Sequence, residues 1–159
     1  MSAGLPSLGR RGEGWFAAQV VLMAAVAVTG LLGTAVAGPA RDVTAVLGLA
    51  LIAVAGIVGL RAMSDLRGSF TPLPHPVEGG ALVDRGVYRA VRHPMYLAVV
   101  TGALGWSLLS GSAVALVASV ILFAFFDLKS RREEAWLEEA YAGYDEYRRR
   151  TRRIVPGLY

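Results

Sequence analysis

The chain alternates four long apolar stretches with polar segments, and this pattern predicts four membrane-spanning helices. Approximately, the stretches are 15–37, 43–60, 95–109 and 113–126. About 20 apolar residues cross the hydrocarbon core of a bilayer, so the third and fourth need a few flanking residues to cross fully. Short connectors within the first pair and within the second pair predict two antiparallel helical hairpins. The first stretch follows Arg10-Arg11 as a signal sequence would, but it exceeds the roughly 7–15 residues of a signal core, so we interpret it as a span.

Two polar segments separate and follow the hairpins. The segment 61–94 contains Thr71-Pro72-Leu73-Pro74-His75-Pro76 and then Gly79-Gly80, which is too interrupted for a helix and predicts a loop with room for a ligand. After residue 126 a helical pattern continues, and apolar and aromatic residues recur along 127–150 at helical spacing. This predicts an amphipathic C-terminal helix that lies on the cytosolic face of the membrane. The fold class is therefore an all-α integral membrane protein, with residues 1–159 forming a single domain.

Small residues recur within the spans at the spacing of one helical turn. The pairs are Ala55 with Gly59, Ala98 with Gly102, and Ala115 with Ser119. In a membrane such pairs allow two helix backbones to approach closely. We interpret them as packing positions of a bundle rather than as a dedicated dimer motif.

Composition and charge support a membrane location. The chain is 55% hydrophobic and only 18% charged, which is unusual for a soluble domain. Of its 16 Lys and Arg residues, Arg41 alone falls on one side of the predicted spans, so both termini and the polar segments are expected in the cytosol of a plasma or inner-membrane protein. Basic residues beside spans favour lipid headgroups over nucleic acid as partners. With no cysteine and two histidines, we expect no metal site.

Two polar clusters fall at one level of the predicted bundle. Arg92-His93-Pro94 begins the third span, and Glu133-Glu134 lies just beyond the fourth. Glu133 is seven residues past Phe126, which places it roughly 10 Å above the span at the rise of an α-helix. Ionisable groups are costly there unless they bind something, so we expect His93 and Glu133 to face one pocket for a charged cofactor.

Each cluster also has a purely structural interpretation. Arg92-His93-Pro94 is a suitable helix start, with Pro94 in the first turn and Arg92 reaching the headgroups. Glu134 fits a solvated helix face set against nearby arginines. The tyrosines at 141, 144 and 147 are typical of packing and interface anchoring.

The motifs resemble the isoprenylcysteine carboxyl methyltransferase family, which is related to the phospholipid methyltransferases. The resemblance rests on 80–88, on Arg92-His93-Pro94-Met95-Tyr96, and on Glu133-Glu134 followed by Leu137, Tyr144, Tyr147 and Pro156. It implies a membrane methyltransferase that uses S-adenosylmethionine and methylates a lipophilic or small-molecule acceptor. The resemblance implies these cofactor-binding residues: Gly80, Ala81, Leu82, Val83, Tyr88, His93, Pro94, Met95, Tyr96 and Glu133.

The chemistry of this cofactor suits those side chains. Its ammonium suits Glu133, its carboxylate suits His93 or backbone amides, and its sulfonium and adenine suit aromatic faces. Arg92 is the candidate catalytic residue, because a guanidinium can orient an anionic acceptor through two hydrogen bonds. Lys129 stands where eukaryotic relatives carry a substrate-associated arginine, and a lysine lacks that planar fork, so the acceptor need not be a prenylated peptide.

Other functions remain open at this stage. The acceptor atom could be oxygen, nitrogen or sulfur. A small non-enzymatic membrane scaffold is the second interpretation. A nicotinamide-dependent membrane reductase is the third, because sterol reductases are similar in their last spans. Binding of S-adenosylmethionine, of a reduced nicotinamide, or of neither distinguishes the three.

Overall fold

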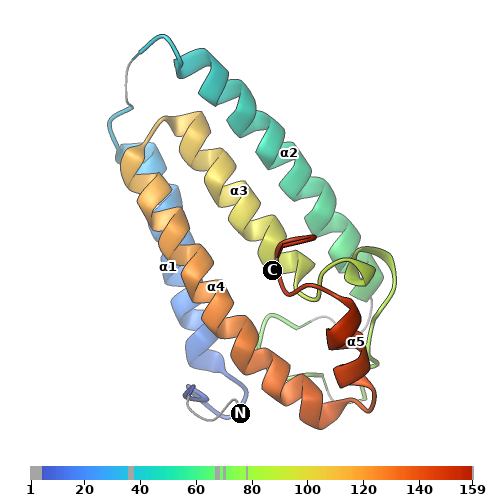
Figure 1. Ribbon diagram of the computed structural model, residues 1–159. Coiled ribbons are helices and arrows are strands. Elements are labelled where there is room, and N and C mark those ends of the chain that lie inside the picture. Colours follow the sequence, from blue (N-terminus) through green and yellow to red (C-terminus); the bar gives the residue numbers. More distant parts are fainter. Residues whose placement is uncertain (1–4, 36–37, 67–68, 70, 78, 159) are drawn as a thin grey trace.

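Four long helices form the bundle of the computed structural model, which describes residues 5–35, 38–66, 69, 71–77 and 79–158 (Figure 1). They are α1 (Glu13–Leu32), α2 (Arg41–Leu66), α3 (Pro94–Ser110) and α4 (Ala113–Ala140). A 3-10 turn, η2 (Gly86–Arg89), lies in the loop between α2 and α3, and the short helix α5 (Tyr144–Arg150) follows α4. No strand occurs in the described part, although Val91 and Arg152 form one isolated parallel bridge.

Three helices of the described chain are long and apolar enough to cross a membrane: α1, α2 and α4. Helix α3 is apolar but has 17 residues, which gives it a length of about 25 Å. The outward faces of α1, α2 and α4 expose large apolar side chains such as Leu31, Leu60 and Val117. A soluble protein rarely exposes so many, whereas a lipid-facing surface requires them.

Helix bounds differ from the predicted ones at three places. Helix α1 begins two residues earlier than predicted and ends at Leu32, because Gly33 is extended and turns its N–H to Thr29; the rest of the predicted span includes residues 36 and 37, which lie outside the described residues. Helix α2 continues six residues past the predicted end at 60, so residues 61–66, which were predicted as part of the loop, are helical. Helix α3 agrees within one residue at each end, with Pro94 in its first turn as predicted.

A single, separate C-terminal helix over 127–150 was predicted, and this prediction is wrong. Residues 127–140 instead extend α4 without interruption, so that one helix runs from the core of the bundle out to Ala140. The helix then stops because Tyr141 is extended and Gly143 adopts a left-handed φ of 88°, which a glycine tolerates. Helix α5 starts after this break and turns back toward the bundle (Figure 1).

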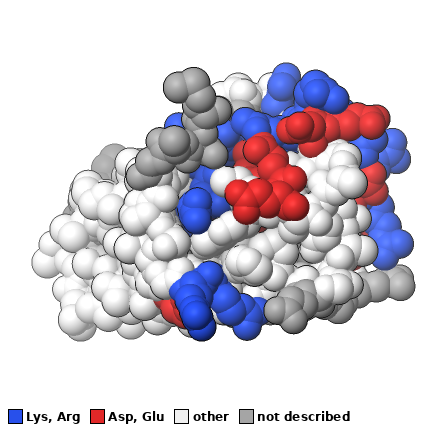
Figure 2. Space-filling model, turned by 90° about the horizontal axis from the view of Figure 1, so that it is seen from below, with Lys and Arg blue, Asp and Glu red and all other residues white. Residues whose placement is uncertain are grey.

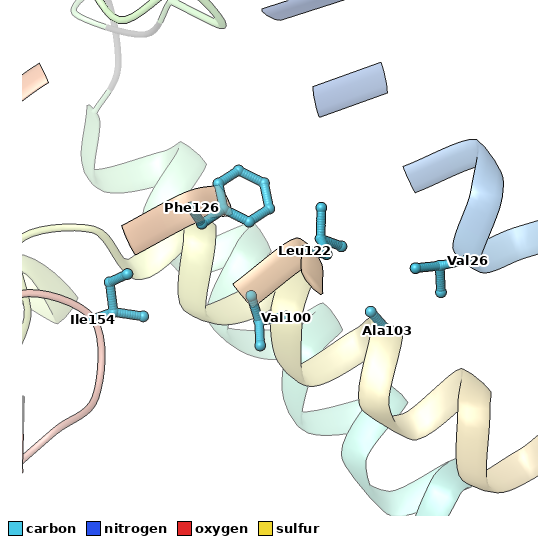
Figure 3. Close-up of a cluster of buried hydrophobic side chains, with 6 residues drawn as sticks. All are labelled: Val26, Val100, Ala103, Leu122, Phe126 and Ile154. Carbon is cyan, nitrogen blue, oxygen red and sulfur yellow. The ribbon is translucent and has the colours of Figure 1, made fainter. Parts of the chain in front are cut away.

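The bundle has two close helix pairs, α2 with α3 and α1 with α4, and α3 also contacts α1 and α4. Its described core contains Val26, Val100, Ala103, Leu122, Phe126 and Ile154 (Figure 3). Ile154 comes from the segment after α5 and is fully buried beside the membrane helices. The C-terminal segment is therefore packed into the bundle end rather than lying apart from it.

Candidate functional site

A pocket opens at the end of the bundle where α2 ends, α3 begins and α4 extends outward. It encloses about 1070 Å³ including its open mouth. The loop before α3 forms one side, α4 and α5 form another, and Gln19 of α1 and Leu66 of α2 contribute from the bundle. Charged side chains of both signs gather on this end of the molecule (Figure 2). This end also carries the amino-terminal segment, whereas Arg41 lies at the opposite end, where it donates hydrogen bonds to the last carbonyls of α3.

The predicted cofactor residues come together in this pocket. Nine of the ten line it: Ala81, Leu82, Val83, Tyr88, His93, Pro94, Met95, Tyr96 and Glu133. The tenth, Gly80, is not in the lining; a Cβ atom there would sit 2.8 Å from the Tyr141 hydroxyl, so the glycine allows the loop to pass close to Tyr141, just after α4. Glu133 thus shares one cavity with residues that lie 37 to 52 positions before it in the sequence.

His93, Tyr96 and Glu133 form a connected polar group. The His93 carbonyl accepts the N–H groups of Tyr96 and Leu97, which starts α3, and the rings of His93 and Tyr96 stack 5.2 Å apart. The Tyr96 hydroxyl donates to the Glu133 carboxylate. His93 Nδ1 lies 3.9 Å from Glu133 Oε2. This arrangement fixes the Glu133 carboxylate on the pocket wall, where it supplies negative charge to the cavity.

Glu134 is buried, whereas one prediction placed it on a solvated helix face. It is 3% exposed, and one of its oxygens, Oε1, lies 2.7 Å from Arg92 Nε and 3.2 Å from His93 Nε2. Its other oxygen lies 3.5 Å from Arg153 Nε. The expectation that Glu134 faces arginines was right, but the contact is buried. A buried carboxylate must be neutralised in this way to be stable.

Arg92 connects the loop to the C-terminal segment. Besides Glu134, its guanidinium donates from Nη1 to the carbonyls of Thr151 at 2.6 Å and of Arg148 at 3.1 Å. The backbone N–H groups of Arg92 and His93 donate to the carbonyls of Arg152 and Arg153. Arg92 lines the pocket, but its Nε and Nη1 atoms are both engaged within the protein. A two-nitrogen clamp on an acceptor would have to displace these contacts.

The three C-terminal tyrosines are site residues that the sequence interpretation assigned to packing. Tyr141, Tyr144 and Tyr147 all line the pocket. The Tyr147 hydroxyl donates to the Tyr88 carbonyl at 2.8 Å, which attaches α5 to the η2 turn. Burial raises the pKa of Tyr88, Tyr144 and Tyr147, so their hydroxyls stay protonated at neutral pH. The sequence signal that could have identified them is their regular spacing of three residues, which favours a shared direction for their side chains.

Lys129 lies behind the pocket rather than in its lining. It is fully buried and donates to the side chain of Gln19 and, at 3.4 Å, to the carbonyl of Pro72. Its ammonium also sits 5.2 Å from the centre of the Tyr96 ring. Since Gln19 and Pro72 do line the cavity, Lys129 joins α1, α4 and the loop at the base of the pocket.

This combination of an apolar helical bundle and a pocket with charged residues at its end agrees with the family comparison. Residues 43–143 match the family model of phospholipid methyltransferases. The chain belongs to the phospholipid methyltransferase family. It is also 36% identical over 77 residues to a protein-S-isoprenylcysteine O-methyltransferase of Schizosaccharomyces pombe. That match covers 47% of this chain and 33% of the yeast protein, so the chain aligns with about a third of its relative.

The predicted family relationship is therefore confirmed, and the protein is a member of a methyltransferase family with membrane helices. The matched range begins with α2, includes the loop and α3, and ends at Gly143. It contains all ten residues predicted to bind the cofactor. It stops just before Tyr144, so the pocket wall contributed by α5 lies outside the matched range.

Proposed function

We propose that this protein is a membrane methyltransferase that binds S-adenosylmethionine in the pocket at the bundle end. The acceptor is a lipophilic or small molecule with a carboxylate or another nucleophile. The observation that carries the proposal is that the loop before α3 and the Glu133 carboxylate of α4 line one cavity. The named relative acts on S-isoprenylcysteine, which supports a lipophilic acceptor.

The residues present fit this cofactor. Glu133 supplies a carboxylate for an ammonium group, and Tyr88 and Tyr96 supply aromatic faces for a sulfonium or an adenine ring. The Tyr144 hydroxyl is buried and has no hydrogen-bond partner among the described residues, so the wall retains a polar group for a ligand. The remaining lining includes apolar residues such as Leu66, Val83 and Val99.

When bound, S-adenosylmethionine supplies an activated methyl group. The protein's part is to hold the reacting groups in line and to keep water away, and the apolar lining serves that purpose. A carboxylate acceptor is already ionised at neutral pH, so a site of this kind needs no general base. The stacked His93 and Tyr96 rings and the Tyr96 to Glu133 hydrogen bond keep the binding groups in fixed positions.

We infer that all four long helices cross the membrane and that the pocket end faces the cytosol. Helix α3 reaches about 25 Å on its own, and flanking residues would complete its crossing. Arg41 lies at the end of the bundle opposite to the pocket. Lys and Arg are enriched on the cytosolic side of membrane spans, so the pocket end, where basic residues gather, is expected to face the cytosol. Membrane lipids would then cover the exposed apolar faces of α1, α2 and α4.

The proposal assigns Arg92 to the pocket wall, and Arg92→Lys tests this. Arg92 reaches Glu134 and Thr151 from two separate nitrogens of its planar guanidinium, and the single ammonium of lysine cannot reproduce that geometry. We therefore expect thermal stability and cofactor affinity to fall together, the latter about fivefold, which corresponds to one weakened hydrogen bond. Unchanged stability and affinity with slower turnover would instead support the predicted role of Arg92 in orienting an anionic acceptor.

Calorimetric titration with S-adenosylmethionine tests the function itself. We expect saturable binding to the purified protein in detergent, and a loss of at least about tenfold in affinity in Glu133→Gln, since a charged hydrogen bond is lost without a change in shape. Glu139→Gln is the matched control, because Glu139 is exposed on the same helix. The control should bind like the wild type.

Absence of binding by the folded wild-type protein would contradict the proposal. Binding of a reduced nicotinamide in the same experiment would favour a reductase, and binding of neither would favour a scaffold. Equal affinity of Glu133→Gln and the wild type for S-adenosylmethionine would support the cofactor but would show that Glu133 does not bind its ammonium group.

A further inference from the structure

The hydroxyl of Tyr144 is a polar group of the pocket wall that the protein leaves unpaired. Tyr144 is 2% exposed and lines the pocket, yet no partner for its hydroxyl exists among the described residues. The next tyrosine of the same helix, Tyr147, is equally buried, but its hydroxyl donates to the Tyr88 carbonyl. A buried hydroxyl without a hydrogen bond is unfavourable, so such a group in a binding pocket indicates a ligand atom.

Tyr144 shares the lining of the pocket with Arg92, His93 and Glu133. Burial raises the pKa of its hydroxyl, Glu134 raises it further, and Arg92 and Glu133 also act on it. The hydroxyl is thus a neutral donor, and Tyr144 lines the same pocket as Glu133, to which we assign the cofactor's ammonium. In an amino acid, the group next to the ammonium is the carboxylate, and a neutral hydroxyl donates most strongly to an anionic oxygen.

We propose that the Tyr144 hydroxyl binds the amino-acid end of the cofactor by donating a hydrogen bond to its carboxylate. This inference rests on the function proposed above and adds a recognition residue from α5, which lies beyond the matched family range. Tyr144 and Glu133 then recognise the two charges of one amino-acid group from two different helices.

The position of Tyr144 is held by contacts that do not involve its hydroxyl. Gly143 sets the start of α5 through its left-handed φ, and the rings of Tyr144 and Tyr147 pack edge to face at 5.8 Å. Arg92 holds the end of the helix through the carbonyl of Arg148. Removing the hydroxyl alone should therefore leave α5 in place.

Tyr144→Phe, measured with two ligands in the full-length protein, tests the inference. S-adenosylhomocysteine carries the amino-acid end, whereas 5′-methylthioadenosine keeps the nucleoside and lacks that end. We expect Tyr144→Phe to weaken S-adenosylhomocysteine about fivefold to tenfold in calorimetry and to leave 5′-methylthioadenosine unchanged. Without ligand, the thermal midpoint of the variant should equal or exceed that of the wild type, because an unpaired polar atom has been removed.

Tyr147→Phe is the matched control, because it removes a hydroxyl that has a protein partner. It should lower the thermal midpoint and affect the two ligands alike. Equal affinities of Tyr144→Phe and the wild type for S-adenosylhomocysteine would overturn the inference, and so would an equal loss for both ligands. A lower midpoint of Tyr144→Phe without ligand would also overturn it, since the hydroxyl would then have a structural partner. A wild-type protein that binds neither nucleoside would instead refute the proposed function on which the inference depends.

Discussion

Replacing Glu134 with alanine is expected to destabilise the protein by about 3–5 kcal/mol, because the change leaves buried positive charge without its partner. Glu134 accepts from Arg92 Nε at 2.7 Å, and both side chains are less than a tenth exposed. His93 and Arg153 also lie within 3.5 Å of its oxygens. Loss of the carboxylate should therefore loosen the junction of α4, the loop before α3 and the C-terminal segment. Denaturant or thermal unfolding in detergent measures the effect.

Two further variants show whether charge is the cause. Glu139→Ala removes an exposed carboxylate from the same helix and should change stability little. The double variant Glu134→Leu with Arg92→Met replaces both charges by apolar groups and should recover part of the loss. The recovery is incomplete because Arg92 also donates to the carbonyls of Thr151 and Arg148. If Glu134→Ala were as stable as Glu139→Ala, the junction would not depend on this carboxylate.

Gly48→Ala should also lower the free energy of unfolding much more than the addition of one methyl group would suggest. Helices α2 and α3 pass so closely at Gly48 that a Cβ there would lie 2.6 Å from the carbonyl oxygen of Gly105 and 2.6 Å from the N atom of Leu109. These are backbone atoms, which cannot rotate away, so the helices must separate. Overpacking of this kind costs about 1–3 kcal/mol, and we expect the upper end of that range.

Gly56→Ala is the matched control, because the same change on the same helix meets no atom within 4 Å. In unfolding measurements this variant should match the wild type or exceed it slightly, since alanine favours helices over glycine. Equal stability of the two variants would mean that α2 and α3 do not approach closely at Gly48.

Sequence reasoning predicted the bundle well because apolar stretches, short connectors and small-residue spacing are local signals. Gly59 does face Ala98, and Gly102 faces Ala55, at separations of 3.5 and 3.4 Å from an added Cβ. The closest approach, at Gly48 and Gly105, was not identified, because a glycine in an apolar stretch looks the same whether it meets a helix or lipid. The predicted end of α2, at residue 60, was too early. The charge of Arg61 was interpreted as the membrane boundary, but a helix can continue past such a boundary, and α2 continues to Leu66.

The candidate pocket was predicted from motifs, and its C-terminal wall was not. The loop residues and Glu133 carry recognisable spacing relative to the spans. The roles of Glu134, Tyr144 and Arg92 depend on how residues 144–154 fold back, and that path is determined by the helix break at Gly143 and by the burial of Ile154. Neither feature has a sequence pattern of its own. A charged helix end such as 127–140 gives the same signal whether it lies on a membrane or extends a span.

The folded-back segment has a consequence for how the protein is made. The backbones of Arg152 and Arg153 pair with the loop before α3, and Ile154 packs in the same core cluster as Phe126. These residues follow every long helix in the chain, so the helices that we propose to cross the membrane can enter it before the pocket has its last wall. A protein that stalls or is cut after α4 would then be inserted normally and remain unable to hold a ligand. Ligand binding would thus distinguish finished molecules from inserted but incomplete ones, which membrane insertion alone cannot do.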